Sequence, residues 1–279
     1  MKKCEKAKIA CENEWTRLFN KGVWDMSIVR EWNELCSEAR RLGKQIHVGR
    51  AFGICVEKGS ELPENHPSRK FKYRVVFGGN DVSGQNWEAA LFQDLGSNPA
   101  SMQAGKAVDC YGCFPGHTVE QCDADQAYVQ AELKGIETWV ALPQEAWPAD
   151  WYNADGTPKY KNPVVRMLLS LYGHPDSGTY WELHLDGKLV EGGFCPVESW
   201  PSCYYHPLLR LLLSVYVDDF KMAGPEATMK EGWKIIRKSI DTDGPAPASL
   251  YLGCKHELKD VKMKDGTIAR KMFIIWKII

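Results

Sequence analysis

No apolar run in this sequence of 279 residues approaches the roughly 20 residues that a helix needs to cross a bilayer. The amino-terminal residues, Met1 to Lys6, are mostly charged and lack the apolar core of a secretion signal. Internal repeats and low-complexity tracts are also absent. These absences predict an intracellular protein, cytoplasmic or nuclear, that makes no contact with a membrane.

A large net charge is likewise missing, because the formal charge is −1 at pH 7. The protein is therefore not a polycation as a whole. Basic residues are nevertheless concentrated near the carboxyl end, where residues 220–279 hold 12 Lys/Arg and 7 Asp/Glu. Such a segment suits a polyanion such as nucleic acid, although a solvated helix face would have the same composition. The ten cysteines are expected to be reduced thiols, because no secretion signal is present.

The most informative stretch is a short apolar run at 208–217 that ends in two aspartates, Asp218 and Asp219, before apolar residues resume. This pattern predicts a buried strand, a turn and a return strand. Carboxylates at such a turn would be held at the rim of the core, where a metal site can be built. Asp also favours ordinary turns. Two adjacent like charges repel, however, and an ordinary hairpin turn more often contains Asn-Gly or Asp-Gly.

Hydrophobic periodicity predicts an α+β chain. Apolar residues recur at helical spacing in some segments and alternate with polar residues in others. Ser27 is the expected cap of the second helix, and Asn98 with Pro99 the expected start of the third. The helices are predicted at 4–20, 27–42, 98–112, 164–171, from 177, and around 229–240, and the strands at 46–56, 69–77, 119–123, 139–142 and 250–254.

The strand at 69–77 carries three cations, Lys70, Lys72 and Arg74, on one face. Three cations on one face of a hairpin suit phosphate binding, for which Arg is the better bidentate partner. An exposed strand face that is protected by charge would show the same pattern. Both interpretations remain open from the residues alone.

Cys110, Cys113, His117 and Cys122 have a spacing that is one residue short of a zinc knuckle. A tetrahedral zinc site needs four ligands that converge on one point. Cys110 is expected at a helix end and Cys122 in the next strand. We therefore expect buried thiols here and no zinc.

Five motifs follow one another along the chain. Residues 121–128 read Gln-Cys-Asp-Ala-Asp-Gln-Ala-Tyr, and residues 216–219 read Tyr-Val-Asp-Asp. The other three are Phe71 to Val76, Leu171-Tyr172-Gly173 followed by Trp181, and Tyr251-Leu252-Gly253. In this order and rough spacing they resemble the reverse transcriptase domain of copia-type long-terminal-repeat retrotransposons, over roughly residues 10–257.

The resemblance implies the fingers and palm of a right-hand polymerase, with an antiparallel sheet backed by helices. Most of a thumb and any RNase H domain are expected to be missing, so the chain looks like a piece of a Pol polyprotein. The expected segments are a helical lead-in at 1–44, fingers at 45–118, a palm at 119–258 and a truncated hairpin at 259–279.

The implied activity is RNA-directed and DNA-directed DNA polymerisation, in which a primer 3′ hydroxyl attacks a dNTP. Two Mg²⁺ ions about 4 Å apart would stabilise the attacking and leaving oxygens, with Mn²⁺ as an alternative ion. Hard oxygen ligands suffice for such ions. The resemblance assigns Asp123 and Asp218 as bridging ligands, Asp219 as support for the primer-side ion, and the Ala124 carbonyl as a further ligand.

The resemblance also assigns residues to the substrate. Tyr128 would pack under the sugar and exclude a 2′-OH, although it could equally be a core aromatic. Tyr216 belongs to the same site, and Lys72 and Arg74 would neutralise the triphosphate. Asp176 stands where the family has Gln, and Thr179 where it has Arg. Asp176 either faces the incoming nucleotide or caps the helix that starts near Ser177.

Two other functions compete with polymerisation. One is a catalytically silent, nucleic-acid-binding remnant of a reverse transcriptase, which the Asp176 departure and the short chain favour. The other is a two-metal nuclease, because three carboxylates alone do not separate cutting from joining. Tyr128 and the basic strand argue against a nuclease. The expected partners are an RNA or DNA template with a primer, dNTPs, and other segments of the polyprotein.

Overall fold

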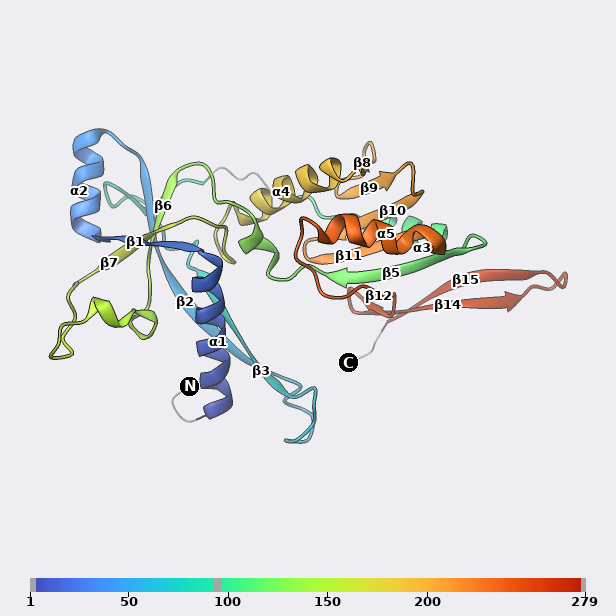
Figure 1. The fold of residues 1–279 in the computed structure, drawn as a ribbon, viewed down its shortest axis with the longest axis horizontal. Helices are drawn as coiled ribbons and strands as arrows, with labels where there is room; N and C mark the ends of the chain where they lie inside the picture. The colour runs from blue at the N-terminus through green and yellow to red at the C-terminus, as the bar shows by residue number, and fades with distance from the viewer. Residues whose placement is uncertain (1–3, 93–96, 277–279) are drawn as a thin grey trace. The chain divides into compact units, whose positions relative to one another are not determined.

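The computed structural model describes residues 4–92 and 97–276, and the chain forms two compact units (Figure 1). The first unit takes in residues 1–95 and 131–180, and the second takes in 96–130 and 181–279. The described residues form several β-sheets and five α-helices, a mixed architecture compatible with the predicted α+β class. None of these helices is long and apolar enough to cross a membrane. The helices are α1 (Glu5–Lys21), α2 (Trp32–Leu42), α3 (Met102–Gly112), α4 (Ser177–Glu191) and α5 (Glu226–Arg237).

The first unit is built on a six-stranded sheet with the order β1-β7-β6-β2-β3, to which β4 is added through β2. The pair β2–β6 is parallel and the other pairs are antiparallel. A small core of buried residues from α2, β2, β6 and β7 holds α2 against this sheet. The strands are β1 (Trp24–Glu31), β2 (Ile46–Lys58), β3 (Lys70–Phe77), β4 (Ser83–Gly84), β6 (Glu137–Ala141) and β7 (Pro163–Met167).

Strands β2 and β3 form a long hairpin (Figure 1). It has one buried face and one exposed face, as its alternating residues predict. Helix α1 contacts the hairpin, and Tyr73 is buried. Gly53 makes room for this ring, since a Cβ at residue 53 would lie 1.7 Å from the Tyr73 hydroxyl. The opposite face exposes Lys72 and Arg74, paired across the strands with Val56 and Ile54.

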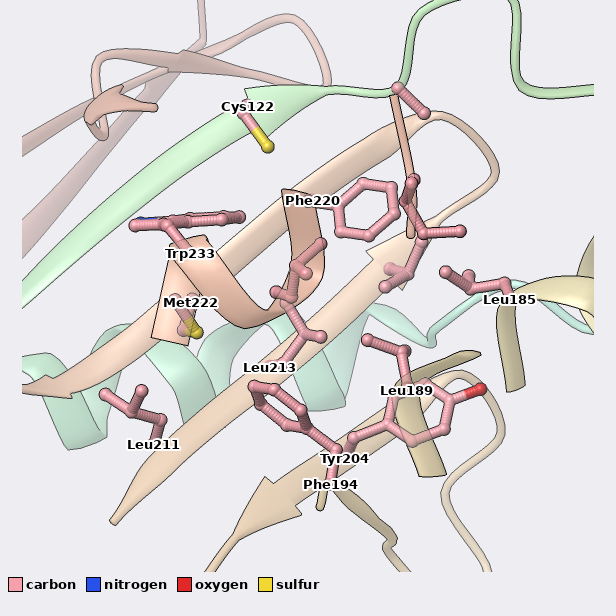
Figure 2. Close-up of a cluster of buried hydrophobic side chains, with 14 of the residues drawn as sticks. Cys122, Leu185, Leu189, Phe194, Tyr204, Leu211, Leu213, Phe220, Met222 and Trp233 are labelled. Atoms are coloured by element: carbon pink, nitrogen blue, oxygen red, sulfur yellow. The ribbon is translucent and has the colours of Figure 1, made fainter. Parts of the chain in front are cut away.

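The second unit contains a six-stranded sheet with the order β12-β5-β11-β10-β9-β8. Strands β10 and β11 form the predicted hairpin, and β11 pairs antiparallel with β5. One sheet face is apolar and packs against α4 and α5, where Phe220, Met222, Leu213 and Trp233 are buried (Figure 2). The strands are β5 (His117–Asp123), β8 (Cys195–Pro196), β9 (Cys203–His206), β10 (Leu211–Tyr216), β11 (Asp219–Pro225) and β12 (Ala246–Pro247).

The other face of this sheet presents the alternate residues of β5, β10 and β11, including Asp123 and Asp219. Helix α3 covers part of this face, where Val108 packs against Val119 and Ala223. A three-stranded sheet in the order β13-β14-β15 follows in the chain, and Met272 of its last strand reaches the same small core. Its strands are β13 (Leu250–Tyr251), β14 (Cys254–Lys262) and β15 (Ile268–Trp276).

Four of the predicted elements are wrong in type or extent. The strand predicted at 250–254 is interrupted by a turn between β13 and β14. Residues 24–31 form strand β1 and not the start of a helix, so Ser27 caps nothing and Ile28 is half exposed. Residues 163–167 form strand β7 and not a helix, because β1 and β7 pair with each other over a long sequence separation. Helix α3 starts after Ser101, whose side chain accepts the Ala104 N–H, and not at Asn98.

Candidate functional site

Two of the candidate carboxylates lie on the tight turn between β10 and β11. Tyr216 and Asp219 pair across the hairpin, which leaves Val217 and Asp218 as its loop. Val217 has a φ of 58°, a conformation that is strained for a β-branched residue. The Trp181 indole N–H, from α4, donates to the Val217 carbonyl at 2.8 Å and so holds the turn in place. The strain thus lies at the residue that precedes the carboxylates.

The third carboxylate reaches the same place through the pairing of β5 with β11. Asp123 is the direct cross-strand partner of Asp219. The next residue, Ala124, donates its N–H to the Asp218 carbonyl at 2.7 Å. The three aspartates are therefore neighbours at one end of the sheet, although Asp123 is far from the other two in sequence.

The proximity of these carboxylates changes their protonation. Burial, then the charges of Asp218 and Asp123 and a hydrogen bond with the Asp123 carboxyl, raise the pKa of Asp219 to about 7. Like charges disfavour ionisation of one another, so one member of such a group holds its proton up to neutral pH. The negative charges of the three carboxylates therefore repel one another, and a cation would relieve this repulsion.

The donor chemistry of this group fits a hard divalent cation. Carboxylate oxygens are the ligands that Mg²⁺ prefers, and an ion would replace the proton that Asp219 holds. In the described part of the chain, no three His, Cys, Asp or Glu side chains are arranged as a metal-binding group. Asp123 and Asp219 instead share a hydrogen bond.

Tyr128 lies close to the carboxylates, on a short 3-10 helix at Ala127–Gln130. It is half-buried and packs against the apolar core of the second unit. Burial, and next the charge of Asp218, raise the pKa of its phenol. Tyr128 is therefore both part of the core and a neighbour of the site. Ala124 is buried beside it.

Tyr216 lines a cavity of about 710 Å³ that opens on the carboxylate face of the same sheet. Its side chain is 40% exposed. Ser214 and Lys221, two pairs further along the hairpin than Tyr216 and Asp219 and on the same face, line the cavity too. Leu252 and Trp276 contribute apolar surface from the carboxyl-terminal segment. The cavity therefore continues the surface on which Asp219 lies.

A buried ion pair forms one wall of this cavity and was not predicted from the sequence. The Lys221 ammonium donates to both carboxylate oxygens of Asp109, at 3.0 and 2.9 Å. It also lies 4.5 Å from the centre of the Tyr251 ring, and the His256 Nε2 is 3.5 Å from Asp109. Burial lowers the pKa of Lys221, and the Asp109 charge acts in the opposite direction.

Lys72, Arg74 and Asp176 belong to the first unit. The Arg74 guanidinium lies over the Tyr172 ring at 5.7 Å. Asp176 takes the backbone position before α4, where its carbonyl accepts the Tyr180 N–H at 3.1 Å. Its Oδ1 is buried and bonds to none of the described residues, and burial raises the pKa of the carboxyl. The backbone thus matches the predicted cap, whereas Oδ1 makes no capping bond.

The four residues with near-zinc spacing do not form a site among the described residues. Cys122 is buried in the apolar core, and the His117 ring lies 3.0 Å from the Tyr111 carbonyl oxygen. The expectation of buried thiols holds for Cys122 but is wrong for Cys110, which is exposed. The α3 helix turns this side chain away from the sheet that it covers.

Two residues near Asp123 were also missed, namely Gln130 and Asp243, which bond the backbone around it. Their partners are distant in sequence, so no local pattern marks them.

Comparison of the sequence with models of known protein families gives no match, and neither does comparison with curated proteins.

Proposed function

We propose that the chain is a reverse transcriptase-type nucleotidyltransferase that extends a primer 3′ hydroxyl with dNTPs on an RNA or DNA template. The observation that carries the proposal is the convergence of Asp123, Asp218 and Asp219 on one end of a sheet. The raised pKa of Asp219 supports it, because perturbed carboxylates mark functional sites. The five copia-type motifs agree with it, and the second unit would be the palm and the β2–β3 hairpin part of the fingers.

Asp123, Asp218 and Asp219, with the Ala124 carbonyl, would hold Mg²⁺, which supplies positive charge to the phosphate oxygens when bound. The chain supplies a fixed backbone for these ligands. The β5–β11 pairing fixes the backbone of Asp123 against that of Asp219, and the Trp181 bond fixes the turn. Electrostatic catalysis favours such fixed positions, because only the side chains would then have to turn toward a bound ion.

The substrate would lie on the carboxylate face of the sheet. The cavity beside Tyr216 is where the proposal places the terminal nucleotide of the primer. Tyr128, next to Asp218, would limit the space at the sugar. Lys72 and Arg74 are the proposed partners of the triphosphate, and Asp176 would reduce affinity for it if it faces the same group.

The direct test is primer extension with purified protein, a labelled primer on RNA and DNA templates, dNTPs and Mg²⁺. Lengthening of the primer by added nucleotides is the expected result. Binding of the primer-template without extension would favour the silent remnant, and shortening of the labelled strand would favour a nuclease.

Metal binding should depend on pH because the ion displaces the proton of Asp219. We expect the apparent association constant for Mn²⁺ to fall about tenfold per pH unit below pH 7 and to level off above it. The sign follows from the raised pKa, since the acid form cannot act as a ligand. Titrations from pH 5 to 8 measure the slope, and Asp219→Asn should flatten it. An association constant that does not change with pH in the wild type would contradict the assignment of Asp219 as a metal ligand.

Tyr128→Ala should admit ribonucleotides by opening space at the 2′ position. We expect the preference for dNTPs over NTPs to fall by about a hundredfold, the discrimination typical of steric exclusion of one hydroxyl. Single-nucleotide incorporation with matched dNTP and NTP pairs measures it. Tyr128→Phe keeps the ring and is the control that should retain the preference. Equal discrimination in the Ala and Phe variants would make Tyr128 a core aromatic only.

A further inference from the structure

The strand that carries Asp123 is held at its second edge by residues 241–250, which we call the edge segment. Strand β11 pairs with one edge of β5, and β12 of the edge segment pairs with the other, through Ala246–Gln121 and Pro247–Glu120. Ala248 donates its N–H to the Val119 carbonyl at 3.0 Å. The edge segment therefore follows β5 along its length and helps to fix its register.

Side-chain amides reinforce this attachment on both sides of Asp123. The Gln121 amide donates to the Leu250 carbonyl at 2.8 Å and accepts the Ser249 N–H at 3.0 Å. The Gln130 amide donates to two carbonyls, those of Asp125 and Asp241, both at 2.9 Å. Gln130 also accepts the Asp241 N–H at 2.8 Å. Each glutamine thus uses both ends of its amide on backbone groups.

Asp243 makes the contact nearest to the candidate ligand. Its Oδ1 accepts the Asp123 N–H at 2.8 Å, and its own N–H donates to the Asp123 carbonyl at 3.0 Å. Both backbone polar groups of Asp123 are therefore bonded to one residue of the edge segment. Rotation of the Asp123 backbone, which would move its carboxylate, requires these bonds to break.

We propose that Asp243 is a positioning residue for Asp123, which fixes the Asp123 carboxylate for metal binding through its side-chain hydrogen bond to the Asp123 N–H. The inference rests on the proposed function, because it assumes that Asp123 is a metal ligand. Hydrogen-bond partners that orient metal ligands typically change metal affinity 10–100-fold when they are removed. The hydrogen bond to the Asp123 N–H needs an acceptor oxygen and not a negative charge. An Asn amide at residue 243 should therefore serve as well as the carboxylate.

The test compares Asp243→Ala, which removes the acceptor, with Asp243→Asn, which keeps an oxygen at the same place. Binding of Mn²⁺ alone, followed by the electron paramagnetic resonance signal of the free ion, is the readout, with Mg²⁺ as competitor. We expect about a tenfold weaker association in Asp243→Ala and less than a threefold change in Asp243→Asn. Glu231→Ala, which removes an exposed carboxylate on α5, is the charge-matched control and should not change binding.

Gln130→Ala keeps the inference testable if Asp243→Ala does not fold, because it loosens the same segment without touching Asp243. It should weaken Mn²⁺ binding as well. Equal binding by wild type and Asp243→Ala would overturn the positioning role alone, as would equal losses in the Ala and Asn variants. Absence of Mn²⁺ binding by the wild type would overturn the proposed function itself, and the inference with it.

Discussion

Asp218→Asn is expected to abolish Mg²⁺-dependent primer extension while the fold is retained. The amide keeps the shape of the side chain and loses the charge that binds the ion. A metal ion supplies several kcal/mol of charge stabilisation in the transition state. The loss of about 4 kcal/mol corresponds to roughly a thousandfold lower rate. Single-turnover primer extension at saturating Mg²⁺ measures this loss.

The structure explains why the fold should survive this change. Asp218 contributes its backbone carbonyl to the bond with Ala124, and an Asn provides the same carbonyl. Asn is also tolerated in tight turns. Circular dichroism and the melting temperature should therefore match the wild type. Asp260→Asn, which disturbs only an exposed pair with Arg270, is the control and should extend primers normally.

Retained activity in Asp218→Asn would remove this residue from the mechanism and leave Asp123 and Asp219 without their partner. Loss of activity together with loss of the fold would instead make Asp218 structural. The melting temperature separates a loss of activity with the fold intact from a loss of the fold, so both the wild type and the variant need that measurement beside the rate.

The sequence predicts those parts of the fold that local pattern determines. The β10–β11 hairpin is one example, because its apolar run and its turn are contiguous. Strand β7 is the opposite case. Its five residues are apolar except for Arg166, and so short a run cannot be assigned to a strand or a helix by periodicity. Pairing with β1 on one edge and with β6 on the other decides the matter, and β1 lies far away in the chain.

The candidate site, too, is only partly predictable from local sequence pattern. The motifs name Asp123, Asp218 and Asp219, and the structure brings these residues together. The groups that hold them, such as Trp181 on the turn and Asp243 on Asp123, act through bonds between distant segments. A hydrogen bond to a backbone group requires no particular pattern around it, so single-sequence reasoning gives it no signal.

Lys221→Met is expected to lower the free energy of unfolding by about 3–5 kcal/mol, the usual effect of removing one partner from a buried ion pair. Lys221 and Asp109 are both almost fully buried, with side chains 2% and 5% exposed. Methionine fills a similar volume and leaves the Asp109 carboxylate without its two charge-assisted bonds. The His256 ring, at 3.5 Å, is then the remaining basic group beside it.

Urea-induced unfolding of the variant against the wild type measures this loss. Lys259→Met removes an exposed lysine that pairs with Glu257 on β14, and it should change the free energy of unfolding by less than about 1 kcal/mol. The difference in the free energy of unfolding between the two variants isolates the effect of burial, because the same atoms are replaced in both.

The double variant Lys221→Met, Asp109→Leu distinguishes the cost of an unpaired charge from a loss of packing. With both charges gone, no buried ion lacks a partner, and apolar replacements of buried pairs are often neutral or stabilising. We therefore expect the double variant to recover most of the stability that Lys221→Met loses. If it is instead as unstable as the single variant, the Lys221 chain stabilises the unit through its contacts with Tyr251 and the sheet. The ion pair would then make no separate contribution.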